Sequence, residues 1–101
     1  MLKVWYLYHN SIELGRLEKL KSDQPWFICQ FYPNSEFEGH SSFFADFEKK
    51  YLSGDIQNYD DFFSSLVVNG YKLKIENKES ERFIILTKNK DQNIVSLRAT
   101  Y

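Results

Sequence analysis

Seven mostly apolar residues between two prolines constrain the fold of this chain more than any other stretch. Residues 26–32 read Trp-Phe-Ile-Cys-Gln-Phe-Tyr, with Pro25 before them and Pro33 after them. A run that is apolar on both sides is typical of a strand buried on both faces, so it predicts a strand inside a sheet. Strand-like stretches at 3–8 and 12–20 precede it. The connections between the three are short, which predicts an antiparallel meander.

The hydrophobic period changes to helical spacing after Pro33. Ser35 and Glu38 form the S-x-x-E pattern of a capping box, and the predicted helix ends at a left-handed cap on Gly54. Its apolar stripe comprises Phe37, His40, Phe44, Phe47 and Tyr51. Asp55 is the predicted N-cap of a second helix, which ends at Asn69-Gly70. The buried side of that helix comprises Ile56, Tyr59, Phe62, Phe63, Leu66 and Val67.

Two hairpins are predicted for the rest of the chain. Residues 71–76 alternate between apolar and polar, residues 83–86 are apolar on both sides and predict a central strand, and a last strand begins near Val95. Within the second predicted strand, the alternation of apolar and polar residues shifts by one position at Gly15, which predicts a bulge or bend. The order βββααβββ indicates one α+β domain over residues 1–101. We expect an antiparallel sheet of about six strands with two helices on one face.

The composition narrows the class of protein. Hydrophobic residues make up 43% and aromatic residues 18%, which excludes a disordered chain. The single cysteine excludes an internal disulfide framework and fits a reducing compartment. No run reaches the ~18 apolar residues of a membrane span, and the first residues lack the features of a signal peptide. We therefore expect a soluble cytoplasmic protein that does not bind membranes.

The residues that could support catalysis are few and separated. Cys29 lies among apolar neighbours, which is typical of an inert core thiol. His9 and His40, with one cysteine, lack the spacing of a zinc site, and a structural role is the expectation for both. Asp60 and Asp61 are adjacent and so cannot share a helix face as a proton-sharing pair. The sequence also contains no phosphate-binding loop or nucleophile elbow. We expect no enzymatic activity, no cofactor and no metal.

A turn and a set of aromatic residues carry a resemblance to other proteins. In the turn Asp23-x-Pro25-Trp26, Asp and Pro are typical turn residues, and Trp26 can anchor the start of the strand in the core. The alternative is that Trp26 is exposed and contacts a partner. The same turn belongs to a series that also includes Gly15-x-Leu17, Phe31-x-Pro33, Phe37 and Phe43-Phe44. The series covers roughly residues 13 to 47. It resembles a group of short bacterial proteins of uncharacterised function, and the resemblance implies a shared fold without an activity.

Charge is distributed unevenly along the chain. From residue 35 to residue 66 there are seven acidic and two basic residues, a net −5, and the remaining residues carry +4, which sums to the net charge of −1. An acidic helical layer favours a protein partner with a basic surface. The hypothesis is an immunity protein or antitoxin that neutralises a basic nuclease toxin. The candidate binding residues are Asp46, Glu48, Asp55, Asp60, Asp61 and Trp26.

Two alternatives belong to other classes. The basic half of the chain could form a sheet that binds single-stranded nucleic acid, although the acidic layer would repel phosphates. The candidate residues for this sheet are Lys3, Trp5, Lys72, Lys74, Arg82 and Arg98. Alternatively, surplus aromatic residues on the far side of the sheet could form a homodimer interface.

Overall fold

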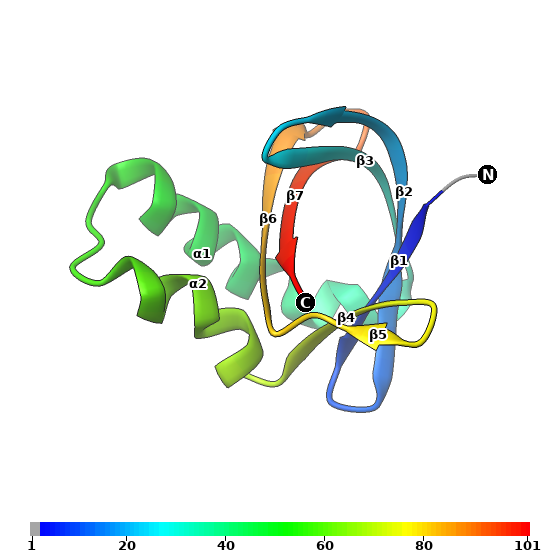
Figure 1. Cartoon of the computed structure of the whole chain (residues 1–101), viewed down its shortest axis with the longest axis horizontal. Coiled ribbons are helices and arrows are strands. Elements are labelled where there is room, and N and C mark those ends of the chain that lie inside the picture. The colour runs from blue at the N-terminus through cyan, green and yellow to red at the C-terminus, as the bar shows by residue number, and fades with distance from the viewer. Residues whose placement is uncertain (1–2) are drawn as a thin grey trace.

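The computed structural model describes residues 3–101 as a curled antiparallel sheet with a pair of helices beside it (Figure 1). The strands are β1 (Val4–His9), β2 (Ile12–Asp23), β3 (Trp26–Pro33), β4 (Tyr71–Ile75), β5 (Lys78–Glu79), β6 (Arg82–Asn89) and β7 (Ile94–Thr100). The helices are the 3₁₀-helix η1 (Ser35–His40), α1 (Ser41–Ser53) and α2 (Tyr59–Val68). The predicted α+β class and the two helices are therefore confirmed.

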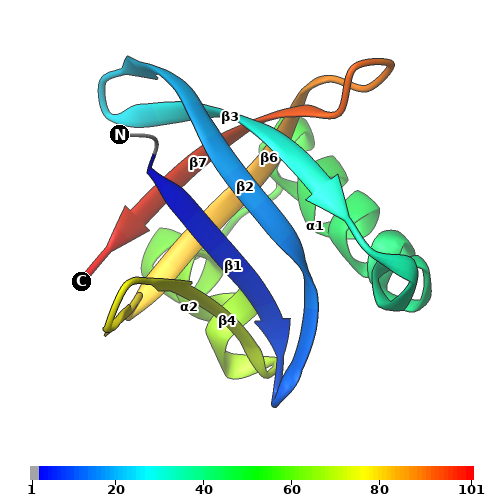
Figure 2. The same cartoon turned by 90° about the vertical axis from the view of Figure 1, so that its right-hand side faces the viewer.

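The sheet has seven strands in the order β5-β4-β1-β2-β3-β7-β6. Figure 2 shows that it curls strongly, so that β6 and β7 lie behind β1 and β2. The predicted meander of β1, β2 and β3 is confirmed, and β3 lies inside the sheet between β2 and β7. The strand beyond the six expected is β5, which has two residues and pairs with β4.

The prediction that β4 and β6 form a hairpin is wrong. β4 pairs with β1 and β5, whereas β6 pairs only with β7 and is the strand at the opposite end of the sheet. The apolar run that predicted a central strand in β6 has another cause. One face of β6 lines the inside of the curled sheet and the other supports the helices, so Phe83, Ile84, Ile85 and Leu86 are all buried. Both faces of β6 are therefore buried although it has a neighbouring strand on only one edge.

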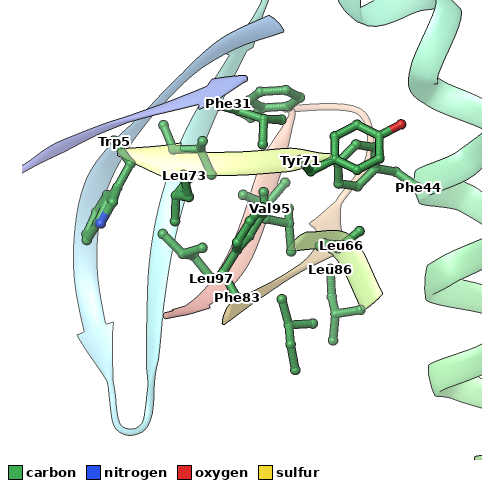
Figure 3. Packing of buried hydrophobic residues seen from close by; sticks show 14 of the residues in the cluster. Trp5, Phe31, Phe44, Leu66, Tyr71, Leu73, Phe83, Leu86, Val95 and Leu97 are labelled. Atoms are coloured by element: carbon green, nitrogen blue, oxygen red, sulfur yellow. The ribbon is translucent and has the colours of Figure 1, made fainter. Parts of the chain in front are cut away.

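The core fills the inside of the curl. Trp5, Leu73, Leu97 and Phe83 point into it from four strands, as Figure 3 shows. Leu66 of α2 is also fully buried, and α2 packs against both β6 and β4. Because these strands belong to opposite ends of the sheet, α2 covers the gap between the two ends.

The helix starts differ from the prediction. Asn34, not Ser35, caps the first segment by accepting a hydrogen bond from the N–H of Glu36, and that segment is a 3₁₀-helix rather than the first turn of α1. Asn58, not Asp55, caps α2, which leaves Ile56 in the connecting loop. Asn and Asp are both good caps, so residue type alone could not choose between them. The end of α1 at a left-handed Gly54 is confirmed.

The predicted irregularity at Gly15 is also confirmed. Leu7 faces Gly15 and Tyr8 faces Glu13, so Leu14 is the extra residue of a β-bulge. Both Leu14 and Gly15 are buried as a result. A Cβ on Gly15 would lie 2.6 Å from the carbonyl oxygen of Tyr32, which explains why the position requires glycine.

Candidate functional site

A groove of about 920 Å³ lies between α1 and α2 and the loop that joins them. Aromatic rings form its apolar part. Phe47 of α1 and Phe62 of α2 stack with ring centroids 4.5 Å apart and planes 10° apart, and Tyr51 lies 6.1 Å from the Phe62 ring. The groove is lined by Phe43, Asp46, Phe47, Lys49, Lys50, Ser53, Asp55, Ile56, Gln57, Asn58, Asp61, Phe62, Ser65 and Asn69.

Three of the candidate acidic residues line this groove. Asp46 belongs to α1, Asp55 to the loop and Asp61 to α2, and all three are exposed. The N–H of Asp61 donates to the Oδ1 of Asn58 at 3.2 Å, which fixes the start of α2 beside the groove. Because Lys49 and Lys50 also line it, the groove carries one net negative charge. The groove therefore combines aromatic rings with three carboxylates, but its net charge is only −1.

The other two candidate acids lie elsewhere and have partners within the chain. Glu48 is half-buried, and its Oε1 accepts a hydrogen bond from the backbone N–H of Thr87 at 2.9 Å. Since β6 has no neighbour on that side, Glu48 pairs with an open strand edge. Asp60 lies on the sheet side of α2, where its Oδ1 is 3.6 Å from Nη1 of Arg82. The five acids therefore do not form one surface.

Trp26 is half-buried and packs against the core at the start of β3. It follows the cis peptide bond between Gln24 and Pro25 and does not line the groove. Its position agrees with the interpretation of a core anchor, and the structure does not bring it together with the three aspartates.

Cys29 is fully buried on the inner face of β3. Burial disfavours the charged thiolate and raises the pKa of the thiol to about 12, although the nearby charge of Lys19 acts in the opposite direction. A thiol in this state is a poor nucleophile at neutral pH.

The structure brings together three side chains that the sequence had not connected. The rings of His9 and His40 lie 4.6 Å apart between centroids, and the ring of Tyr71 lies 4.7 Å from that of His9. A hydrogen bond of 2.7 Å joins His40 Nδ1 and the Tyr71 hydroxyl. The three residues come from β1, the junction of η1 and α1, and the start of β4. No local spacing could have indicated this cluster.

The hydrogen bonds of the cluster connect the ends of several elements. His9 Nε2 lies 3.1 Å from the carbonyl oxygen of Asn69, which can only accept, so this nitrogen carries the proton. Burial raises the pKa of Tyr71, which keeps its hydroxyl protonated and able to bond to His40. A Cβ on Gly70 would lie 3.2 Å from His9 Nε2. The cluster thus holds β1 and β4 against the end of α2 and the start of α1.

Over residues 3–101, no three His, Cys, Asp or Glu side chains gather into a candidate metal site. In the same residues no helix is both long enough and apolar enough to cross a membrane. Comparisons with protein-family models, with curated proteins and with solved structures find no match to this chain.

Proposed function

We propose that this chain is a non-enzymatic protein-binding domain whose groove between α1 and α2 accepts a basic surface of a partner protein. The observation that supports the proposal best is the convergence of Asp46, Asp55 and Asp61 on one groove with an aromatic interior. The most specific form of the proposal is an immunity protein or antitoxin that covers the basic active site of a nuclease toxin.

The chemistry of the groove suits arginine and lysine side chains. Their charged ends can reach the carboxylates at the rim, while their apolar stems contact the small part of Phe47 and Phe62 that remains exposed. A guanidinium group also binds favourably to aromatic faces and to carboxylates. Lys49 and Lys50 would in turn disfavour an all-cationic partner, so we expect mixed charge at the rim of the partner surface.

Electrostatics should contribute mainly to the rate of association. The helical segment carries −5 between residues 35 and 66, and complementary fields accelerate encounter at low salt. The effect decreases as salt screens it, because the Debye length is only about 10 Å at 0.1 M.

The test requires a basic partner, which is sought among the proteins that neighbouring genes encode and is then purified and immobilised for measurement of association rates. Neutralising the groove with Asp46→Asn, Asp55→Asn and Asp61→Asn should slow association by roughly tenfold or more at 50 mM salt, and by less at 500 mM salt. A matched control removes three exposed acids outside the groove, with Glu36→Gln, Glu81→Gln and Asp91→Asn.

The two variants have the same net charge, so their difference isolates position. A larger effect of the groove variant supports the groove as the binding site. Equal effects would contradict it, and would leave only attraction by overall charge. Absence of binding by the neighbouring protein would contradict the immunity form of the proposal.

A further inference from the structure

A row of alternating cations and tyrosines crosses four adjacent strands on the outer side of the sheet. Lys74 of β4 is paired with Tyr6 of β1, Tyr6 is paired with Arg16 of β2, and Arg16 is paired with Tyr32 of β3. Directly paired residues have their side chains on the same face of a sheet. The four side chains therefore form one continuous line.

The row lies on the solvent side. The residues that alternate with it, including Leu7, Leu17 and Leu73, are fully buried in the core, so the row points outward. Tyr6 is 40% exposed and Tyr32 is 41% exposed. Figure 2 looks onto the outer side of β1 and β2, with both helices behind the sheet.

The cations are held against the rings. The guanidinium carbon of Arg16 lies 4.3 Å from the Tyr32 ring centroid. In the adjacent row, Tyr8 pairs with Lys72, and the Nζ of Lys74 lies 4.9 Å from the Tyr8 ring centroid. The result is an outer face with three tyrosines and three cations interleaved on four strands. We call it the outer face and define it as Tyr6, Tyr8, Arg16, Tyr32, Lys72 and Lys74.

We infer that the outer face binds single-stranded nucleic acid. Such a strand presents aromatic bases alternating with anionic phosphates, and open sheets with exposed aromatic side chains recognise it by stacking bases on the rings. The interleaved cations lie where phosphates of a stacked strand would pass. Glu13, Glu18 and Glu79 also point to this side; Glu18 lies 3.4 Å from Arg16 and Glu79 is paired with Lys74. Three acids thus balance the three cations of the face, so stacking must supply most of the affinity.

This site differs from the residues that charge alone suggested. Trp5 is 1% exposed and lies inside the core, so it cannot stack on a base. Arg82 and Arg98 lie next to α2, where Arg82 faces Asp60 and Arg98 lies over the Phe63 ring. The Nζ of Lys3 lies 5.3 Å from the Phe27 ring centroid and does not belong to the row. Of the residues expected from the sequence, Lys72 and Lys74 belong to the outer face, and the three tyrosines and Arg16 are new.

Anisotropy of a fluorescein-labelled 12-nucleotide oligouridine at 50 mM salt tests the inference. The wild type should bind, and Tyr6→Leu or Tyr32→Leu should each weaken binding by about tenfold, because stacking contributes roughly 1–3 kcal/mol per base. Leucine retains apolar volume, and Tyr6→Phe, which retains the ring, should bind like the wild type. Lys74→Gln should lower the slope of log K against log salt by about 0.7.

Tyr59 supplies the matched control, because it is 53% exposed at the start of α2 and belongs to none of the four strands that carry the row. Tyr59→Leu should leave oligonucleotide binding unchanged. Absence of binding, or equal loss with Tyr59→Leu, would overturn the inference. A dimer in sedimentation equilibrium that Tyr6→Leu dissociates, without oligonucleotide binding, would also overturn it and assign the face to a second copy of the chain.

Discussion

The groove and the outer face both combine aromatic rings with charges, but they are constructed differently. In the groove, Phe47 and Phe62 come from two helices, and the carboxylates surround rings that already stack on each other. On the outer face, Tyr6 and Tyr32 stand on hydrogen-bonded strands with a cation between them. The comparison indicates that one region offers carboxylates above a closed aromatic contact, and the other offers partly exposed tyrosine rings with cations beside them.

The support beneath the two regions also differs. The outer face stands directly on strands whose inner residues fill the core. The helical pair reaches the curled sheet through α2, through the Glu48 hydrogen bond to Thr87, and through the Phe44 ring at the start of α1, which lies 4.9 Å from that of Tyr71. We therefore expect the groove to change shape more easily than the outer face, and the measurements that follow test this difference, beginning with the largest effect.

The closed interior beneath the outer face predicts a very unreactive Cys29. With a pKa of about 12, the thiolate fraction at pH 8 should be on the order of a thousandfold below that of a free thiol. The rate of reaction with Ellman's reagent in the native protein measures this. Rapid reaction without denaturant would show that β3 opens readily, and would contradict a rigid outer face.

The same thiol makes stability depend on pH. The unfolded chain loses the Cys29 proton near pH 9 and the folded chain only near pH 12, so the folded state binds the proton more tightly. The free energy of unfolding should therefore fall as pH rises from 9 to 12. Cys29→Ala should reduce this decline, measured by urea unfolding at several pH values. An unchanged decline would mean that other groups cause it.

Leu66→Ala tests how the helical pair is attached. Leu66 is fully buried, and replacing a buried leucine by alanine costs about 3 kcal/mol. Val68→Ala is the control, because Val68 is 79% exposed at the end of the same helix. Urea unfolding followed by tryptophan fluorescence should show one transition for both variants. A separate early transition in Leu66→Ala would show that the helices detach before the sheet unfolds.

Gly15→Ala tests the register beneath the outer face. The added Cβ would lie 2.6 Å from the Tyr32 carbonyl oxygen, and backbone must move to accept it, which we expect to cost about 2 kcal/mol. Gly39→Ala is the matched control, because no atom lies within 4 Å of the added Cβ there. Since Tyr32 belongs to the row, Gly15→Ala should also weaken oligonucleotide binding. Unchanged stability would contradict the close approach of β2 and β3.

Much of the sheet could be predicted from local pattern, because the alternation of apolar and polar residues along a strand shows which side chains are buried. The meander, the irregularity at Gly15 and the cap at Gly54 are such cases. The neighbours of β4 and of β6 in the sheet could not be predicted in this way. An apolar run such as residues 83–86 reports burial on two faces, and a curled sheet buries an end strand as completely as a central one.

The candidate site was predictable in composition but not in arrangement. The excess of acids in the helical segment was visible, yet Glu48 and Asp60 form contacts with β6 that depend on how the helices dock. The row on the outer face depends on three strand registers at once. Its tyrosines and cations are separated by up to 68 positions between Tyr6 and Lys74, so no sequence window contains them.

Glu48→Ala should have a smaller effect than the core and glycine substitutions. It removes the acceptor for the Thr87 N–H, and a partly exposed hydrogen bond to a charged group contributes about 1 kcal/mol. The neighbouring Lys49→Ala is the control for changes on the same helix. Hydrogen exchange of the Thr87 amide should accelerate in Glu48→Ala only. Unchanged exchange would mean that this strand edge is protected without Glu48.

The smallest effect on stability is expected for Asp60→Asn. The Asp60 side chain is 87% exposed and its contact with Arg82 spans 3.6 Å, and such surface pairs contribute less than about 0.5 kcal/mol. Asp61 is the adjacent residue, but it faces the groove, whereas Asp60 faces the sheet side of α2. In the partner-association assay, Asp61→Asn should therefore slow binding more than Asp60→Asn, although the two variants have the same charge and adjacent positions. Equal slowing would show that the partner senses the whole acidic segment and not the groove, which would remove the functional contrast between the two sides of this helix.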